Sequence, residues 1–301
     1  MQTDYVQRFL FEDLDIRGRL VCLTRAWQRM LDGRGYPEDI AALLGHTTAL
    51  NVLLGANQKG SCRVTLQVQG SGPVRLLVAD CTADLQIRGM ASYREHGKIE
   101  GSERHLLGDG RLSVTLEEVS SGQMYQSLVP LEGDTLEQIF QHYLSQSEQT
   151  TAYLRLKADG GALCGLLLEK LPQAGARDPA GWNRVTHLAS TLTLDETRDA
   201  QPYDLLTRVF PEELMRVFRL YPVEYHCPYD EAKVKDMLLG LGAGEVFVAH
   251  SLPEAAELLR APTLPGKTNL LLRWTGADDA DARYLPVPNP LRTSDAAGGG
   301  Q

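Results

Sequence analysis

The sequence predicts an α+β protein with a mixed α/β N-terminal core domain, a helical linker and a small C-terminal α+β domain. Three observations predict this class. Residues 63–70, RVTLQVQG, alternate apolar and polar side chains as a half-buried strand does. Residues 40–58 form a long apolar stretch of helical length, and residues after 173 form short amphipathic stretches separated by prolines. The domain boundaries that we expect are 1–172, 173–222 and 223–288, followed by a disordered tail over 289–301.

The core domain begins with FLFEDLDIRGRLVCLT (9–24), which mixes apolar and charged residues as a pair of early strands would. A buried helix follows over 40–58. Its apolar residues recur at helical spacing and include Leu43, Leu44, Leu50, Leu53 and Leu54.

Strands and one helix complete the predicted core domain. GSGP (70–73) is a turn between the strand 63–70 and a returning strand, VRLLVADC (74–81). LLGDGRLSVTL (106–116) predicts a turn and then a strand. GDTLEQIFQHYLSQSEQ (133–149) predicts an amphipathic helix, and residues 152–171 predict a hairpin around Asp159-Gly160-Gly161.

The linker reads as three amphipathic helices. WNRVTHLASTL spaces Trp182, Val185, Leu188 and Leu192 three or four residues apart. YDLLTRVF follows Pro202 and EELMRVF (212–218) follows Pro211, and proline is favoured in the first turn of a helix. This segment is too short to form a hydrophobic core of its own. Its apolar faces must therefore pack against another part of the protein or against a partner.

The C-terminal unit predicts two short helices and a hairpin. The first helix, EAKVKDMLLGL, ends at Gly242, and a capping box at Ser251 and Glu254 opens the second. TNLLLRW (268–274), an acidic turn and ARYLPV (282–287) predict the hairpin.

Composition excludes several classes of protein. Hydrophobic residues make up 43% of the 301 residues and the formal net charge is −9, so we expect no broad nucleic-acid binding. The N-terminus lacks the basic and apolar pattern of a signal peptide, and no apolar run approaches bilayer length, so we expect a cytoplasmic protein without membrane contact. Five scattered cysteines are not a disulfide framework.

The sequence contains none of the common catalytic motifs considered below, so we do not expect an enzyme. The chain has no GxxxxGK[ST], HExxH or GxSxG motif, and GLGAG (240–244) ends a helix instead of opening one. Cys22, Cys62, Cys81 and Cys164 lie in or beside apolar strands and are expected to be buried, as structural cysteines are. A zinc site needs four ligands, whereas Cys227, His226 and His250 supply at most three in no standard spacing.

Several blocks together resemble the Hsp33 family of redox-regulated molecular chaperones. They are FLFEDLDIRGRLV (9–21), VTLQVQGSGPVRLLVADCT (64–82), LQIRGMA (85–91), LLGDGRLSVTL (106–116) and YQSLVPLEGDTLEQIFQHYLSQSEQ (125–149). The resemblance implies an ATP-independent holdase, not an enzyme. In the typical member a CxC and a later CxxC bind zinc when reduced. Oxidation forms two disulfides and releases the metal, and the linker and C-terminal domain unfold to capture clients, often as a dimer.

The chain departs from that pattern at the zinc site. Cys227 matches the first cysteine of the CxC, but Tyr229 stands at the second, and the hairpin over 271–285 contains no cysteine. We therefore expect no zinc and no family-type disulfide switch. Apolar packing could replace the metal, or the C-terminal unit could be permanently loose and the chaperone always active.

Three hypotheses follow. The first is a holdase for unfolding proteins, constitutive or heat-activated, which contacts clients or a second copy through the linker. Its candidate residues are Trp182, Val185, Leu188, Leu192, Leu205, Leu206, Val209 and Phe210. The second is a one-cysteine redox sensor at Cys227, with His226 lowering its pKa. The third is a binding module for one specific partner that has lost chaperone action.

Overall fold

The computed structural model divides the chain into two compact units, Met1–Cys227 and Pro228–Gln301, each described by itself. The residues that the structure describes are 4–58, 60–94, 101–147, 149–172, 174, 178–199, 201–227 and, in the second unit, the strands 246–249, 269–274 and 283–287.

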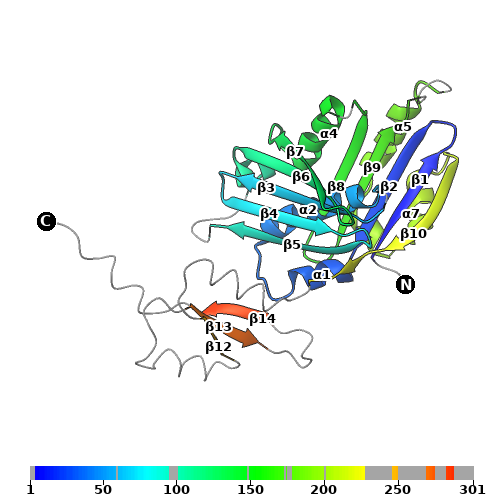
Figure 1. Cartoon of the computed structure of the whole chain (residues 1–301). Helices are drawn as coiled ribbons and strands as arrows, with labels where there is room; N and C mark the ends of the chain where they lie inside the picture. The colour runs from blue at the N-terminus through cyan, green and yellow to red at the C-terminus, as the bar shows by residue number, and fades with distance from the viewer. Residues whose placement is uncertain are drawn as a thin grey trace, which may run out of the picture. The chain divides into compact units, whose positions relative to one another are not determined.

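Two sheets form the frame of the first unit (Figure 1). Sheet A is antiparallel and has the order β10-β1-β2-β9-β8, with β1 at Tyr5–Phe11, β2 at Ile16–Leu23, β8 at Ala152–Ala158, β9 at Leu163–Lys170 and β10 at Met215–Pro222. Sheet B has the order β11-β5-β4-β3-β6-β7. Its strands are β3 at Cys62–Gly70, β4 at Val74–Cys81, β5 at Gln86–Tyr93, β6 at Gly110–Glu118, β7 at Gln123–Pro130 and β11 at Glu224–Tyr225. Within it, β11 pairs with β5 in parallel.

Helix α2, Glu38–Gly55, lies between the two sheets and contacts strands of both (Figure 1). It can be buried nearly all round because apolar residues such as Leu43, Leu50 and Leu53 cover more than one of its faces. Three of its buried polar side chains donate hydrogen bonds: Thr47 and Thr48 donate to carbonyls one turn back, and Asn51 Nδ2 donates to the Val64 carbonyl of β3 at 2.9 Å. Helices α1 at Arg25–Leu31, α3 at Glu103–Leu107 and α4 at Leu136–Ser147 extend this inner core.

The opposite face of sheet A carries a second layer of helices. They are α5 at Gly181–Ser190, α6 at Leu194–Asp199 and α7 at Pro202–Val209. Their apolar side chains share a separate buried cluster with sheet A, called the outer core below. The order of layers is therefore sheet B, α2, sheet A and the helices α5 to α7.

The predicted fold class is confirmed, and most predicted elements lie where their patterns placed them. The strand 74–81 matches β4, the helix 40–58 matches α2, and the hairpin around Asp159-Gly160-Gly161 joins β8 to β9. In the second unit, β13 at Asn269–Trp274 pairs antiparallel with β14 at Arg283–Val287, as the hairpin prediction required. Strand β12 at Val246–Ala249 pairs in parallel with β13.

The predicted helix over 212–218 is wrong. Residues 215–222 form β10, which pairs with β1 along the edge of sheet A. Local pattern favoured a helix after Pro211, but the free backbone groups of β1 offered a partner, and tertiary pairing overrides weak propensity. The first compact unit includes the helical segment and ends at Cys227. The expected boundaries at 172 and 222 stay predictions.

Other expectations fall outside the described residues. These are the C-terminal helices near 231–241 and 251–259 and the tail over 289–301. Within the part of the chain that the structure describes, no helix has the length and apolarity to cross a bilayer.

Candidate functional site: the helix-covered face of sheet A

The outer face of sheet A is apolar because its strands alternate. On β1, Tyr5, Phe9 and Phe11 point to the outer core, and on β2, Ile16, Leu20 and Cys22 do so. On β9, Cys164, Leu166 and Leu168 continue this face. The result is an apolar surface over three adjacent strands.

Helices α5 to α7 cover this surface with the residues predicted from the linker pattern. Val185, Leu192, Leu205, Leu206, Val209 and Phe210 are buried, and Trp182 and Leu188 are partly buried against the same cluster. The structure thus brings all eight candidate residues together. In this arrangement they face sheet A, so the six buried ones reach a client or a second copy only if the helices leave the sheet.

Phe210, directly after α7, is an aromatic anchor of the docked helices. Its ring lies 5.0 Å from the ring of Phe11 at an interplanar angle of 82°, and 6.2 Å from the ring of Phe9. Phe9 and Phe11 themselves pack edge to face at 5.4 Å. Such edge-to-face contacts add about 0.5–1.5 kcal/mol per pair beyond the burial of the rings.

Gly18 makes room for this aromatic cluster. It lies directly opposite Phe9 in the β1–β2 pairing. A Cβ added at Gly18 would lie only 2.1–2.6 Å from atoms of the Phe9 ring. The ring therefore packs over the bare backbone of β2, which no other residue type allows without displacing it.

Electrostatic contacts hold helix α5 in place. The Arg184 guanidinium on α5 pairs with Glu213 at 2.6 Å, just before β10, and with Asp178 at 2.9 Å. Lys170 at the end of β9 lies 5.1 Å from the centre of the Trp182 ring. These contacts are partly exposed to water, so each contributes little by itself.

The cysteines fall into two groups, as their sequence context predicted. Cys22, Cys62, Cys81 and Cys164 are buried, whereas Cys227 is exposed at the end of the first unit. The His226 side chain is also exposed, and its backbone N–H donates to the Ile87 carbonyl at 3.0 Å. Tyr229 and His250 lie outside the described residues. Among the described residues, no three His, Cys, Asp or Glu side chains gather as metal ligands would.

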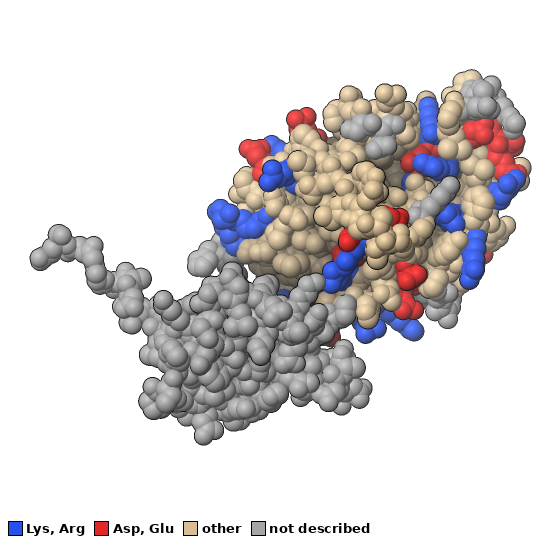
Figure 2. Space-filling view, viewed as in Figure 1, with Lys and Arg blue, Asp and Glu red and all other residues tan. Residues whose placement is uncertain are grey.

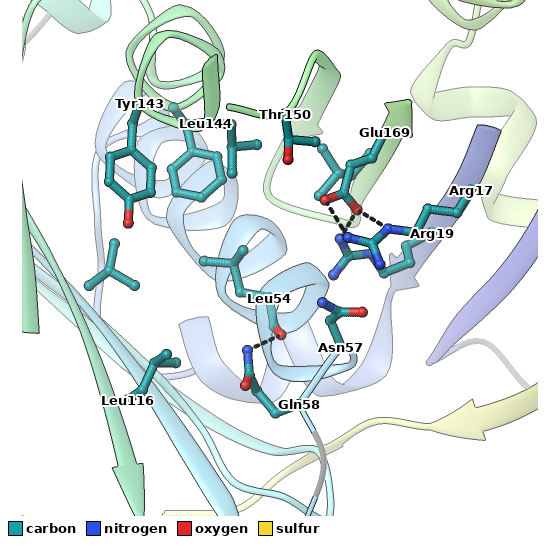
Figure 3. Close-up of a pocket in the computed structure, with 13 residues that line it drawn as sticks. Arg17, Arg19, Leu54, Asn57, Gln58, Leu116, Tyr143, Leu144, Thr150 and Glu169 are labelled. Carbon is teal, nitrogen blue, oxygen red and sulfur yellow. Dashed lines mark hydrogen bonds and ion pairs between the residues drawn. The ribbon is translucent and has the colours of Figure 1, made fainter. Parts of the chain in front are cut away.

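A pocket of about 230 Å³ opens on the opposite side of sheet A, between α2, α4 and β6. Figure 3 shows its two halves: Leu54, Leu116 and Leu144 are apolar, while Arg17, Arg19 and Glu169 form an ion-pair network. Burial opposes the charge of Glu169, but the charge of Arg19 and the hydrogen bonds from Arg17 and Arg19 outweigh burial and lower its pKa. Because the carboxylate is committed to two guanidinium groups, the pocket offers no carboxyl group poised for proton transfer.

Sequence reasoning missed one exposed apolar surface. Strand β7 is an edge of sheet B, and its Met124 and Leu128 side chains are 68% and 56% exposed. Their side chains point to the same face of the strand because their spacing, four residues, is even. The segment 125–149 contributed to the family resemblance, but its alternation is weak and gave no signal of a solvent-exposed edge.

Charges on the visible face of the first unit are mixed. Figure 2 shows basic and acidic side chains interspersed there, with uncharged surface between them. Such a surface provides no single-sign field of the kind that attracts a polyanion.

Comparisons with known proteins agree on one family. The family model described as Hsp33 protein matches residues 4–257. The "33 kDa chaperonin" of Methylobacillus flagellatus is 38% identical over 248 residues, which cover 81% of this chain and 84% of that protein. The "33 kDa chaperonin" of Neisseria meningitidis is 37% identical, with 81% and 82% covered.

A solved structure agrees with the fold. The crystal structure of the 33 kDa chaperonin (heat shock protein 33 homolog) from Thermotoga maritima superposes with a TM-score of 0.66 at 19% identity. It covers 79% of this chain and 85% of the other.

Proposed function

Since the chain belongs to the Hsp33 protein family, whose matched relatives are named as chaperonins, we propose that it is an ATP-independent holdase that works without the zinc–thiol switch. The observation that carries the proposal is the apolar face of sheet A with its cover of short helices. When α5 to α7 leave the sheet, both the sheet face and the helix faces become available to apolar segments of an unfolding client.

The helical cover consists of short helices that depend on sheet A for their stability. Helices α5, α6 and α7 have 10, 6 and 8 residues. Isolated helices shorter than about 12 residues are marginal in water, so these depend on their packing against sheet A. Segments of low local stability open before the rest of a protein does, which favours activation by heat.

The donor set of the chain does not fit the zinc of the family. Four of the five cysteines are buried in the first unit, far apart in sequence from Cys227. Tyr229 replaces the next family ligand and the hairpin 271–285 offers no thiolate. We therefore propose a chain without bound zinc, whose activation does not begin with metal release.

Unfolding proteins are the partners that we propose, and a second copy of the chain is another once the helices have left. A client needs no specific sequence to bind an apolar face, because the hydrophobic effect is non-directional. The exposed Met124 and Leu128 on β7 add apolar surface that is available even while the helices are docked.

The test is light scattering of a thermally unfolding client, with this protein added after pretreatment in reductant or in peroxide. Equal suppression of aggregation after both treatments supports a holdase free of a redox requirement. No suppression in either, with the protein itself folded by circular dichroism, removes the holdase proposal. Capture of one stoichiometric partner from unheated lysate would then favour the specific binding module.

A further inference from the structure

Two buried thiols face each other beneath the helical cover. Cys22 on β2 and Cys164 on β9 are direct partners in the antiparallel pairing, and their Sγ atoms are 3.6 Å apart. Direct partners in such a pair have Cα atoms about 4.5–5.5 Å apart, within the range that a disulfide spans. Bond formation shortens the sulfur separation to about 2.05 Å, which side-chain rotation can supply without moving the strands.

The surroundings keep the pair reduced while the helices are docked. Both thiols belong to the outer core, together with Val185 and Ala189 of α5 and Leu205 and Leu206 of α7. The thiolate is the form that reacts with oxidants. The hydrogen bond with Cys22 and burial raise the pKa of Cys164, so little thiolate forms there. An oxidant also has no direct access to a buried sulfur.

We propose that Cys22 and Cys164 are an oxidative modification site, which forms a cross-strand disulfide when α5 to α7 leave the face of sheet A. The oxidant class is a peroxide. One thiolate attacks a peroxide oxygen to give a sulfenic acid and hydroxide, and the hydroxide takes up the proton that this thiol released and becomes water. The second thiol then displaces water from the sulfenic sulfur. The two thiols together lose two electrons and two protons, and one hydrogen peroxide becomes two waters.

The disulfide would join two strands of the proposed client-binding face covalently. It joins β2 to β9, which are neighbours at the centre of sheet A, at a sequence separation of 142. A cross-link that closes so long a loop restricts the unfolded chain and stabilises the folded sheet. Sheet A would then keep its shape while its helical cover is away. The control of oxidation by the helices rests on the undocking proposed above. The separation of the two sulfur atoms does not depend on that proposal.

The test uses the full chain and reads the bond directly. Protein is exposed to hydrogen peroxide at a low temperature and just below its unfolding transition. Free thiols are then alkylated under denaturing conditions, and the chain is digested without reductant for mass spectrometry. We expect a linked peptide that contains Cys22 and Cys164, formed several-fold faster at the higher temperature and absent after reduction with dithiothreitol. Free alkylated Cys22 and Cys164 at both temperatures would overturn the proposal.

Two matched substitutions test the gating. Val185→Ala loosens the cover, whereas Val52→Ala removes the same group from a fully buried helical valine of the inner core. We expect faster linkage in Val185→Ala than in Val52→Ala; equal rates would contradict gating by the helices. Cys22→Ala must abolish the linked peptide and leave Cys164 alkylated. None of these readouts depends on chaperone activity, so they stand apart from the light-scattering assay.

Discussion

Arg19 and Glu169 form an ion pair between β2 and β9, and both side chains are almost fully buried, at 4% and 7% exposed. Arg19 also donates to the Leu53 carbonyl at 2.6 Å, at the end of α2. This single guanidinium thus ties two strands of sheet A to the central helix. The pair lies on the face of sheet A opposite the helical cover, so it holds the sheet to α2 without any contribution from α5 to α7.

Glu169→Gln tests this anchor. The substitution leaves the buried Arg19 charge without its counter-ion, and breaking a buried pair in this way costs about 3–5 kcal/mol. We expect the free energy of unfolding, measured with urea, to fall by that amount. Asp109→Asn is the control because the Arg104–Asp109 pair is largely exposed, and it should change stability little. Similar losses of unfolding free energy in both variants would show that the buried pair contributes no more to stability than the exposed pair does.

Acid should destabilise the first unit through its paired carboxylates. Burial opposes the charge of Asp80, but hydrogen bonds from Arg63, Thr65 and Arg88 together with the charge of Arg63 outweigh it and lower its pKa; the pKa of Glu169 is lowered as well. A lowered folded-state pKa gives stability that is present above the ordinary carboxyl pKa of about 4 and is lost as the pH falls through the folded-state value. We expect unfolding free energy to decline below about pH 4, with a shallower decline in Asp80→Asn. An unchanged slope in that variant would exclude Asp80 as a source.

Phe210→Ala should loosen the helical cover. It removes the ring that packs against Phe9 and Phe11, and truncation of a buried phenylalanine costs about 3–5 kcal/mol. We expect suppression of client aggregation to begin at a lower temperature than in the parent chain. Tyr203→Ala, on the exposed side of α7, is the control and should leave the onset unchanged. A higher onset in Phe210→Ala would contradict the docking hypothesis and point to the ring as a client contact.

Gly18→Ala should destabilise sheet A by overpacking. The added methyl group collides with the Phe9 ring, and such insertions cost about 1–3 kcal/mol. The double variant Gly18→Ala with Phe9→Leu should lose less than the sum of the two single losses in urea unfolding, because the smaller side chain makes room. Strict additivity would mean that Phe9 does not constrain Gly18.

Cys227→Ser separates the holdase from a one-cysteine sensor. Cys227 is the exposed cysteine among the described residues, so it is the thiol that an oxidant meets first in the docked state. Under the holdase hypothesis, we expect unchanged suppression of aggregation in both reductant and peroxide. A peroxide response that vanishes in Cys227→Ser would support the sensor instead.

Local sequence patterns predicted an element correctly where one of its faces is buried and the other is exposed to solvent. The alternation over 63–70 predicted β3, and the apolar spacing after Trp182 predicted α5 together with the residues that it buries. The pattern failed at β10, because its residues pair with β1 from Phe11↔Met215 to Tyr5↔Pro222, a distance in sequence that no local window includes. It also gave no sign of the exposed edge at β7.

The sequence by itself determined the fold class and the burial of four cysteines, since these follow from side-chain type and local spacing. Tertiary structure alone decided that the candidate contact residues face sheet A and that Cys22 meets Cys164. Strand order and register set both relationships, and these are settled by packing across the whole unit rather than by any neighbouring residues.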